Sequence, residues 1–268
     1  MSAGLMAGKR GLIMGVANDK SIAWGIAQAC HAQGAEMAFT YQGDALKKRV
    51  EPLAASVGSD IVLPCDVTDT ASVDAVFAEL EAKWGKLDFL LHAIAYADKA
   101  ELKGRYVDTS PENFAMSMNI SCYSFTALAQ KAEKLMTDGG SMLTLTYYGA
   151  EKVMPHYNVM GVAKAALEAS VRYLANDLGP QKIRVNAISP GPMRTLAGSA
   201  VGGARRVFKE TEENAPLRAN AALEHVGGTA VYLLSDLGAS TTGEVLFVDG
   251  GYHAIGMTQL ENLVRPQG

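Results

Sequence analysis

The sequence has few cysteines and few histidines, and these shortages exclude several kinds of site. Among its 268 residues there are three cysteines, Cys30, Cys65 and Cys122, and none belongs to a CxxC pair. An odd number of widely spaced thiols argues against a disulfide framework and favours reduced cysteines in a cytoplasmic protein. The five histidines lack metal-ligand spacing, so we expect no metal site.

The chain also lacks an excess of positive charge and a long hydrophobic segment. Its formal net charge is −4, which excludes the basic footprint of a protein that binds nucleic acid. The most apolar run, at 87–97, carries Asp88 and His92 and is shorter than the ~20 apolar residues of a membrane-spanning helix. The start of the chain does not resemble a signal peptide. We therefore expect a cytoplasmic protein with no nucleic-acid partner and no membrane insertion.

Hydrophobic residues, by contrast, are abundant, at 49% of the chain, and they form short runs between amphipathic segments. These runs predict strands at residues 10–14, 36–41, 61–65, 87–94, 141–147, 183–189 and 244–248. Helices are expected between them at 22–33, 44–56, 69–84, 111–136, 157–178 and 223–235. Gly34 should end the first helix, Asp69 should cap the third, and Pro111 suits a first helical turn. Seven strands alternating with helices predict an α/β fold, a Rossmann-like, doubly wound parallel sheet with helices on both faces.

The chain shows no repeat and no linker-like segment, so we expect a single domain over residues 1–268. The Gly-rich connection at 190–220 is long for a compact domain. Because connections of this kind often cover a binding site, we expect a mobile substrate lid at about 193–215.

The first predicted strand leads into a glycine turn of the kind that binds dinucleotides. Gly15 follows the strand, and Ser21 and Ile22 begin the next helix. Backbone N–H groups and the helix dipole at such a junction attract a pyrophosphate. The turn is longer than GxGxxG, and a tight strand–helix turn without a ligand is the alternative. Its place at the first strand–helix junction favours a dinucleotide.

The end of the second strand bears on which dinucleotide binds. Gln42 stands where an Asp or Glu would bind a ribose 2′-hydroxyl and an Arg would accept a 2′-phosphate. The basic residues Lys47, Lys48 and Arg49 follow, but a solvated helix face explains them more simply. Asp66, after the third strand, is suited either to an adenine amino group or to a local turn. We expect NADH as the cofactor in preference to NADPH.

Tyr157 and Lys164 form the candidate catalytic pair. Seven residues separate them at the start of a predicted helix, which places both on one face, about 10 Å apart along the axis. A nearby ammonium lowers the pKa of a phenol, and such a phenol can donate a hydrogen bond or a proton to an oxyanion in a substrate. Two unrelated surface residues at this spacing are the alternative.

The motifs around this pair resemble those of the short-chain dehydrogenase/reductases. Most members have Tyr-x-x-x-Lys, but here Met160 stands four residues before Lys164 and the tyrosine is Tyr157. A second tyrosine, Tyr147, follows the fifth predicted strand. This arrangement is similar to the bacterial enoyl-acyl-carrier-protein reductases of type II fatty acid synthesis, and the similarity runs from about Gly8 to Gly256. Further matches lie at residues 21–27, 39–42, 65–67, 184–189 and 243–251.

The resemblance implies a role for each matching residue. Tyr157 would hydrogen-bond the thioester carbonyl as it becomes an enolate, Lys164 would hold the nicotinamide ribose, and Tyr147 would face the acyl chain. The cofactor would contact Gly15, Ser21, Ile22, Gln42, Asp66, Val67, Ile94, Lys164, Met193, Arg194, Thr195, Leu196 and Ala197. The substrate would contact Ala97, Tyr147 and Tyr157. The implied reaction is hydride transfer from NADH to a trans-2-enoyl thioester carried by acyl carrier protein.

The resemblance also implies partners. Acyl carrier protein is acidic, so a chain that is itself net negative needs a local basic patch to bind it. The candidates are Arg194, Arg205, Arg206 and Lys209, although a solvated helix face is an equal alternative. The family implies a homotetramer packed through the predicted helices at 111–136 and 157–178.

Two other functions are compatible with the same fold. A ketoacyl- or alcohol-type reductase would need Tyr-x-x-x-Lys and a serine after the fifth strand, where this chain has Met160 and Tyr147. A non-catalytic NAD(H)-binding regulator would not need Tyr147, Tyr157 or Lys164.

Overall fold

A seven-stranded parallel sheet forms the centre of the computed structural model, which describes residues 4–195 and 203–263. The strand order is β3-β2-β1-β4-β5-β6-β7, and every neighbouring pair runs parallel. The strands are β1 Arg10–Met14, β2 Glu36–Tyr41, β3 Val62–Pro64, β4 Phe89–His92, β5 Gly140–Leu145, β6 Ile183–Pro190 and β7 Val245–Val248. The predicted α/β class and the seven parallel strands are confirmed.

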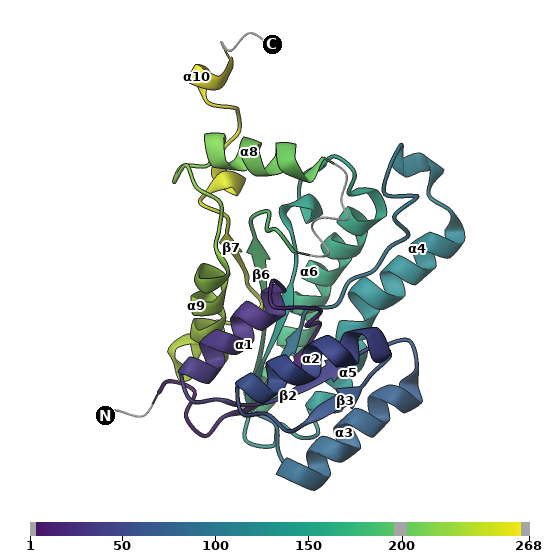
Figure 1. Ribbon diagram of the computed structural model, residues 1–268, viewed down its shortest axis with the longest axis vertical. Helices are drawn as coiled ribbons and strands as arrows, with labels where there is room; N and C mark the ends of the chain where they lie inside the picture. Colours follow the sequence, from purple (N-terminus) through teal and green to yellow (C-terminus); the bar gives the residue numbers. More distant parts are fainter. Residues whose placement is uncertain (1–3, 196–202, 264–268) are drawn as a thin grey trace.

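Helices cover both faces of this sheet (Figure 1). The helices buried against one face are α1 Ile22–Ala32, α2 Asp44–Ser56 and α9 Leu223–Leu234. Those buried against the other are α3 Thr70–Trp84, α5 Ser124–Ala132 and α6 Asn158–Leu178. In β1, Ile13 belongs to the first cluster, whereas Leu12 and Met14 belong to the second. Because successive side chains of a strand point to opposite faces, a doubly covered strand reads as a continuous apolar run.

The other helical segments lie at the ends of these layers. The remaining α-helices are α4 Pro111–Met118, α8 Ala204–Asn214 and α10 Leu260–Leu263. Short 3-10 turns are η1 Tyr106–Asp108, η3 Tyr148–Ala150, η4 Gly179–Gln181, η5 Asp236–Gly238 and η6 Tyr252–Ala254. In Figure 1, β6 runs upward towards α8, so the carboxyl ends of the parallel strands lie on the side of α8.

Three predicted helix boundaries are confirmed by local contacts. Asp69 caps α3 by accepting a hydrogen bond from the N–H of Ala71. Pro111 lies in the first turn of α4, and Gly34 follows α1 with a φ of +90°. The N-cap position of α3 needs a side-chain acceptor, the first turn of α4 tolerates a residue without an N–H, and the residue after α1 needs a left-handed backbone. Each of these preferences can be recognised in a sequence.

The prediction of a single helix at 111–136 is wrong. A π-helix, η2 Asn119–Tyr123, separates α4 from α5, and α5 ends at Ala132. Within η2, the hydroxyl of Ser121 accepts from the N–H of Tyr96 at 2.9 Å and donates to its carbonyl at 3.0 Å. The wide turn therefore holds the loop that follows β4. Hydroxyl bonds of this kind compete with helical ones, and π-turns are frequent at functional sites.

Strands β4 and β5 are shorter than the predicted runs at 87–94 and 141–147. The N–H of Thr146 still bonds the carbonyl of Ile188 at 2.9 Å, but η3 begins two residues later. Ile94 and Tyr147 consequently lie in loops beyond the carboxyl ends of their strands. These are the positions from which an α/β sheet presents side chains to a ligand.

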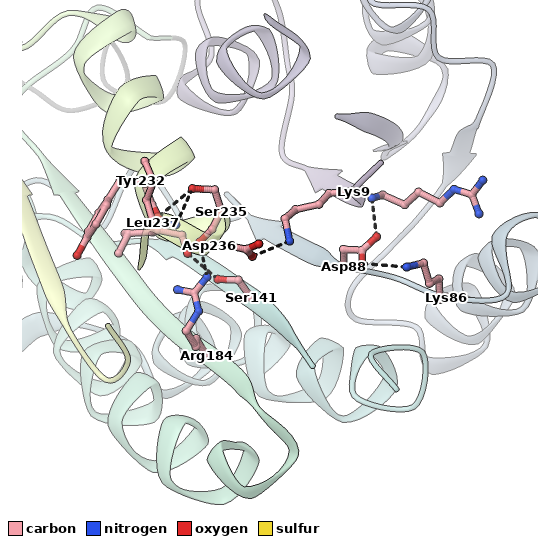
Figure 2. A network of polar contacts seen from close by, with 11 residues as sticks. Lys9, Lys86, Asp88, Ser141, Arg184, Tyr232, Ser235, Asp236 and Leu237 are labelled. Carbon is pink, nitrogen blue, oxygen red and sulfur yellow. Dashed lines mark hydrogen bonds and ion pairs between the residues drawn. The ribbon is translucent and has the colours of Figure 1, made fainter. Parts of the chain in front are cut away.

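A polar network at the opposite, amino end of the sheet anchors α9 (Figure 2). The hydroxyl of Ser141, at the start of β5, donates to the carbonyl of Leu233 at 2.9 Å. The guanidinium of Arg184, at the start of β6, donates to the carbonyl of Ser235 at 3.1 Å. Lys9 forms an ion pair with Asp236 at 2.9 Å. Because the last carbonyls of a helix lack partners within it, Ser141 and Arg184 complete the C-terminal end of α9, while Lys9 holds the turn η5 that follows it.

Gly15 ends β1 where the strand order reverses, with β2 on one side and β4 on the other. Its φ is +99°, and a Cβ built on it would lie 2.1 Å from the carbonyl oxygen of Ala93. Both the backbone conformation and the lack of space require glycine at this position.

Replacement of Gly15 by alanine is expected to destabilise the protein by about 3 kcal/mol, because the methyl group meets rigid backbone in a left-handed conformation. Gly58 is the matched control, since its φ is +72° and a Cβ there meets no atom within 4 Å. Gly58→Ala should lose only about 1 kcal/mol. Urea unfolding midpoints at equal protein concentration measure both, and equal losses would contradict the steric explanation.

Candidate active site

The predicted site residues follow one another along the carboxyl edge of the sheet. In strand order they are Asp66 and Val67 after β3, Gln42 after β2, Gly15 after β1, Ile94 and Ala97 after β4, Tyr147 after β5, and Met193, Arg194 and Thr195 after β6. Open α/β sheets bind ligands in the crevice outside this edge, where the strand order reverses. Leu196 and Ala197 lie outside the described residues.

Ser21 shapes the turn between β1 and α1. Its hydroxyl accepts hydrogen bonds from the N–H groups of Ala17 and Asn18 at 2.9 and 3.0 Å. Although Ser21 is the N-cap of α1, its side chain makes no cap hydrogen bond to the helix. The first-turn N–H groups of α1 are therefore not capped by this side chain, and such groups form an anion-binding site.

Gln42 and Asp66 meet at the β2–β3 end of this edge. The Gln42 amide donates to Asp66 Oδ2 at 3.0 Å, while Oδ1 accepts from the N–H and hydroxyl of Thr68 at 2.9 and 2.7 Å. These bonds, those of Thr68 first, hold the pKa of Asp66 below its usual value. The turn role considered for Asp66 is thus observed. The negative charge beside Gln42 disfavours a 2′-phosphate and favours a ribose with a free 2′-hydroxyl.

Lys47, the first of the basic residues after Gln42, forms an ion pair within its own helix. Lys47 lies 3.7 Å from Glu51 and 5.9 Å from the centre of the Tyr41 ring. This arrangement agrees with a solvated helix face and gives no support to a phosphate site at Lys47.

At the other end of the crevice, three successive residues at the carboxyl end of β5 each contact a different side chain of α6 or its N-cap. Lys164 donates to the Leu145 carbonyl at 2.7 Å, and Thr146 donates to Glu168 Oε1 at 2.6 Å. The rings of Tyr147 and Tyr157 pack edge to face, with centroids 5.1 Å apart. The structure therefore brings Tyr147, Tyr157 and Lys164 to one place through the end of a single strand.

Tyr157 is the N-cap of α6, one position before the helix itself. A Cβ on Gly149 would lie 2.4 Å from Cδ1 of its ring, so glycine is required for this packing. Burial raises the pKa of Tyr157, with Tyr147 and Glu168 adding to the effect. The predicted lowering of this pKa is wrong, because desolvation of the phenolate dominates. Tyr157 is a neutral hydrogen-bond donor.

Lys164 is only 6% exposed. Burial lowers the pKa of its ammonium to about 8, against the opposing effects of Cys122 and Glu168. Lys164 is consequently still largely protonated at neutral pH and loses its charge on the alkaline side.

His92, in β4, is fully buried and hydrogen-bonded on both ring nitrogens. Nδ1 lies 2.8 Å from the Thr144 hydroxyl and Nε2 lies 2.9 Å from that of Ser124. Ser124 donates to the carbonyl of Ile120 at 2.6 Å, a shorter bond than the 3.2 Å from the Thr144 hydroxyl to the His92 carbonyl, so we assign the proton to Nε2. Burial, and then Lys164, lowers the pKa of His92 to about 3. This histidine therefore joins β4, β5 and α5 without adding charge.

Ala97, predicted to contact the substrate, is packed deeply against the start of α6. Ala97 and Met160 are each 7% exposed and share a small apolar cluster against which Tyr157 packs. Met160 therefore packs as an ordinary core residue. Met193 is buried with α1 and α9, whereas Arg194 is exposed and lies 5.5 Å from the centre of the Phe208 ring on α8.

Two residues that the sequence did not reveal flank Tyr157 in left-handed conformations. His156 has a φ of +58° and Asn158 a φ of +38°. The Asn158 amide donates to the carbonyls of Glu101 and Gly104 at 3.2 and 3.4 Å. The loop after β4 is thereby tied to the start of α6. Asparagine tolerates this conformation better than most residues, which is the one signal that the sequence carried.

Asn158→Gly and Asn158→Ala are expected to separate the two functions of this side chain. Both lose the amide, but only glycine keeps an unstrained left-handed backbone. Asn158→Ala should therefore be less stable than Asn158→Gly by about 1 kcal/mol. Urea unfolding at equal concentrations tests the difference, and an alanine variant at least as stable as the glycine variant would refute it.

No helix among residues 4–195 and 203–263 is long and apolar enough to cross a membrane. Within those same ranges, no group of three or more His, Cys, Asp or Glu side chains is placed to hold a metal ion.

Comparison with known proteins gives a consistent result. A family model described as "Enoyl-(Acyl carrier protein) reductase" matches residues 15–253. The chain is 65% identical to the enoyl-[acyl-carrier-protein] reductase [NADH] 1 of Rhizobium meliloti, over 97% of this chain and 96% of that protein. It is 56% identical to the NADH enoyl reductase of Rickettsia bellii, over 97% and 99%.

Solved structures agree with the sequence relatives. The reductase of Anaplasma phagocytophilum in complex with NAD is 62% identical, with a TM-score of 0.93 over 97% of this chain and 99% of that one. The reductase of Bacillus cereus with NADP+ and an indole naphthyridinone is 51% identical, also with a TM-score of 0.93, over 95% and 100%.

Proposed function

This chain belongs to the enoyl-(acyl carrier protein) reductase family, and from that premise we propose how its residues perform the family's reaction. The protein is an NADH-dependent enoyl-acyl-carrier-protein reductase of fatty acid synthesis, which reduces the carbon–carbon double bond of an enoyl thioester. We assign the catalytic roles to Tyr157 and Lys164, with Tyr147 beside them. The observation that supports this assignment is the set of contacts between the end of β5 and α6.

The crevice has the donor groups that NADH requires. Its pyrophosphate suits the turn at Gly15 and the start of α1, and its adenosine suits Gln42 and Asp66 at the ends of β2 and β3. Lys164 supplies a buried ammonium for the ribose hydroxyls at the nicotinamide end. When bound, NADH supplies a hydride for the β-carbon of the substrate.

Tyr157 and Lys164 stabilise the charge that this reaction creates. Reduction at the β-carbon moves negative charge onto the thioester oxygen, where a positioned donor lowers the barrier most. The phenol of Tyr157 is neutral and able to donate there, while the ammonium of Lys164 keeps positive charge near the same oxygen. Tyr147, whose pKa burial raises to about 12, is also neutral and packs edge-on against Tyr157. It fixes the ring of Tyr157 and bounds the space for the acyl chain.

The ketoacyl-type alternative lacks the hydroxyl that it needs. Thr144 and Thr146 are the hydroxyls nearest to the required position, and both are buried, in contact with His92 and Glu168 respectively. Tyr147 follows them in place of a serine. A purely regulatory NAD(H)-binding role would leave this tyrosine pair and the buried Lys164 without a purpose.

Acyl carrier protein docking is assigned to the exposed start of α8. Arg205 and Arg206 are exposed there, whereas Lys209 is paired with Glu213 at 3.7 Å. Arg194 lies against Phe208 of the same helix, so α8 lies beside the segment that follows β6. We extend the proposal to residues 193–215 as the segment that covers the acyl chain, although residues 196–202 lie outside the described part of the chain, and to a single domain over residues 1–268.

The surface of η2 and α6 supports a proposal about subunit assembly. Exposed aromatic side chains lie on η2 and α6, where Tyr123 is 61% and Tyr173 76% exposed. Large apolar groups exposed on adjacent helices are typical of subunit interfaces. We propose a homotetramer packed through α4, α5 and α6, and a cytoplasmic location; the mass in solution by light scattering tests the former.

Tyr157→Phe is expected to lower kcat for a trans-2-enoyl thioester by about 100-fold or more, because it removes the donor to the developing oxyanion. Its Kd for NADH should stay within about twofold, since the ring is retained. Tyr148→Phe, which removes a hydroxyl bonded to the His253 carbonyl, is the matched control and should keep most of the activity. Stopped-flow or steady-state loss of absorbance at 340 nm measures both. Wild-type kcat in Tyr157→Phe would refute the assignment.

Reversal of charge in Arg205→Glu/Arg206→Glu is expected to raise KM for a carrier-bound substrate about tenfold, because the acidic carrier would meet like charge. KM for a small thioester analogue should not change. Lys83→Glu/Lys134→Glu, at exposed positions on α3 and after α5, changes the net charge by the same amount and serves as the control. Equal changes in KM for the two substrates would contradict a docking role for α8.

A further inference from the structure

Glu168 is a buried acid close to the active site that the mechanism above does not use. It is 8% exposed and lies one helical turn beyond Lys164 on α6. Its Oε1 accepts a hydrogen bond of 2.6 Å from Thr146, which is itself 4% exposed. Thr146 is the residue between Leu145, which binds the Lys164 ammonium, and Tyr147. The acid is therefore joined directly to the segment that assembles the site.

A carboxyl in this position needs a compensating interaction, because burial of an ionised group is unfavourable unless it is paired or hydrogen-bonded. Thr146 provides one such interaction. The charged or titratable groups that act on Glu168 are Lys164 and Arg172 on α6 and Glu151 after η3, and Glu168 acts in turn on Tyr157. Those that act on or respond to Lys164 are Cys122 from η2, His92 from β4 and Glu168.

We propose that Glu168 is a positioning residue of this enzyme, which keeps Lys164 in its charged form and holds the turn after β5 through Thr146. The inference rests on the proposed role of Lys164. Helical residues four apart are neighbours on one face, and the negative charge of Glu168 favours the charged form of the Lys164 ammonium. Without that negative charge, an ammonium buried to this degree would be neutral over more of the working pH range.

The directions of the pKa shifts agree with this arrangement. Burial lowers the pKa of Lys164 to about 8, while Cys122 and Glu168 oppose the shift. Burial raises the pKa of Glu168, and the Thr146 bond counteracts this. His92 is held neutral and contributes no charge near pH 7.

Glu168→Gln tests the charge alone, because glutamine has the same shape and retains an oxygen that accepts from Thr146. With the carboxylate removed, the pKa of Lys164 falls further. Lys164 then deprotonates at a lower pH, and the function that needs its charge is lost earlier as pH rises. We expect the alkaline limbs of NADH affinity and of kcat/KM to move down by about one pH unit. Below pH 6.5 both quantities should stay within about twofold of wild type.

The measurements are the NADH Kd, from cofactor fluorescence, and kcat/KM for an enoyl thioester, each from pH 6 to 9.5. Asp177→Asn removes an exposed carboxylate from the same helix and should leave both limbs in place. Glu168→Asp keeps the charge and should keep the limbs within a few tenths of a unit of wild type. Cys122→Ser tests the other group that acts on Lys164. Unmoved limbs in a folded Glu168→Gln protein, or a shift in Cys122→Ser alone, would overturn the proposal.

Thr146 gives an independent route if Glu168→Gln does not fold. Thr146→Val deprives the carboxylate of its donor and disfavours its ionised form, so the limbs should move in the same direction. Thr146→Ser keeps the hydroxyl and should restore them; a wild-type profile in Thr146→Val would also overturn the proposal. Failure of the proposed function has a different signature. If the role of Lys164 is wrong, Lys164→Ala will bind and turn over NADH like wild type. If only the role of Glu168 is wrong, Lys164→Ala will still lose activity, and the alkaline limb of Glu168→Gln will match that of wild type.

Discussion

The buried ammonium of Lys164 is the constraint around which this end of the molecule is organised. Removal of such a charge from water is unfavourable by several kcal/mol unless nearby groups compensate for the lost solvation. The carbonyl of Leu145, the last residue of β5, accepts a hydrogen bond from the Lys164 ammonium at 2.7 Å. Strand β5 lies between β4 and β6, so this carbonyl is fixed by the middle of the sheet. The position of the charge thus depends on the sheet and not on a surface loop.

The neighbouring polar groups are consistent with that requirement. His92 lies beside β5 in β4, and its two hydroxyl partners and its burial keep it neutral. A protonated histidine there would repel Lys164. The π-helix that interrupts α4 and α5 brings Ser121 to both backbone groups of Tyr96 and so holds the loop after β4. Asn158 ties the same loop to the start of α6. The substrate side of the crevice is therefore built from contacts that all reach back to β4, β5 or α6.

Much of the fold could be predicted because its causes are local. Buried parallel strands read as apolar runs, and Asp69, Pro111 and Gly34 satisfy needs of single helix ends. The positions of Gly15, Gln42 and Tyr147 in the crevice could also be predicted from the sequence, because each residue follows a strand. The π-helix was not, because its sequence suits an α-helix and only the tertiary contact of Ser121 with Tyr96 distinguishes the two.

The electrostatic details were the least predictable part of the site. The spacing of Tyr157 and Lys164 suggested a lowered phenol pKa, but burial reverses the direction, and burial is a property of the whole fold. Glu168 has the appearance of an ordinary helix residue until Thr146 is seen to approach it from β5. The contact of Ser21 with the cofactor stays a prediction, and the sequence did not reveal that its hydroxyl also accepts hydrogen bonds from the turn. In each instance, the deciding partner is distant in sequence or is backbone.

We conclude that this crevice reduces an enoyl thioester with NADH and does not reduce a ketone. The most direct measurement follows absorbance at 340 nm for the wild-type protein with NADH, using matched trans-2-enoyl and β-ketoacyl thioesters of one chain length. The arrangement of Tyr147, Tyr157 and Lys164 predicts oxidation of NADH with the enoyl substrate only. Turnover of the ketoacyl substrate alone would contradict it, and would place the chemistry with the hydroxyls at the end of β5.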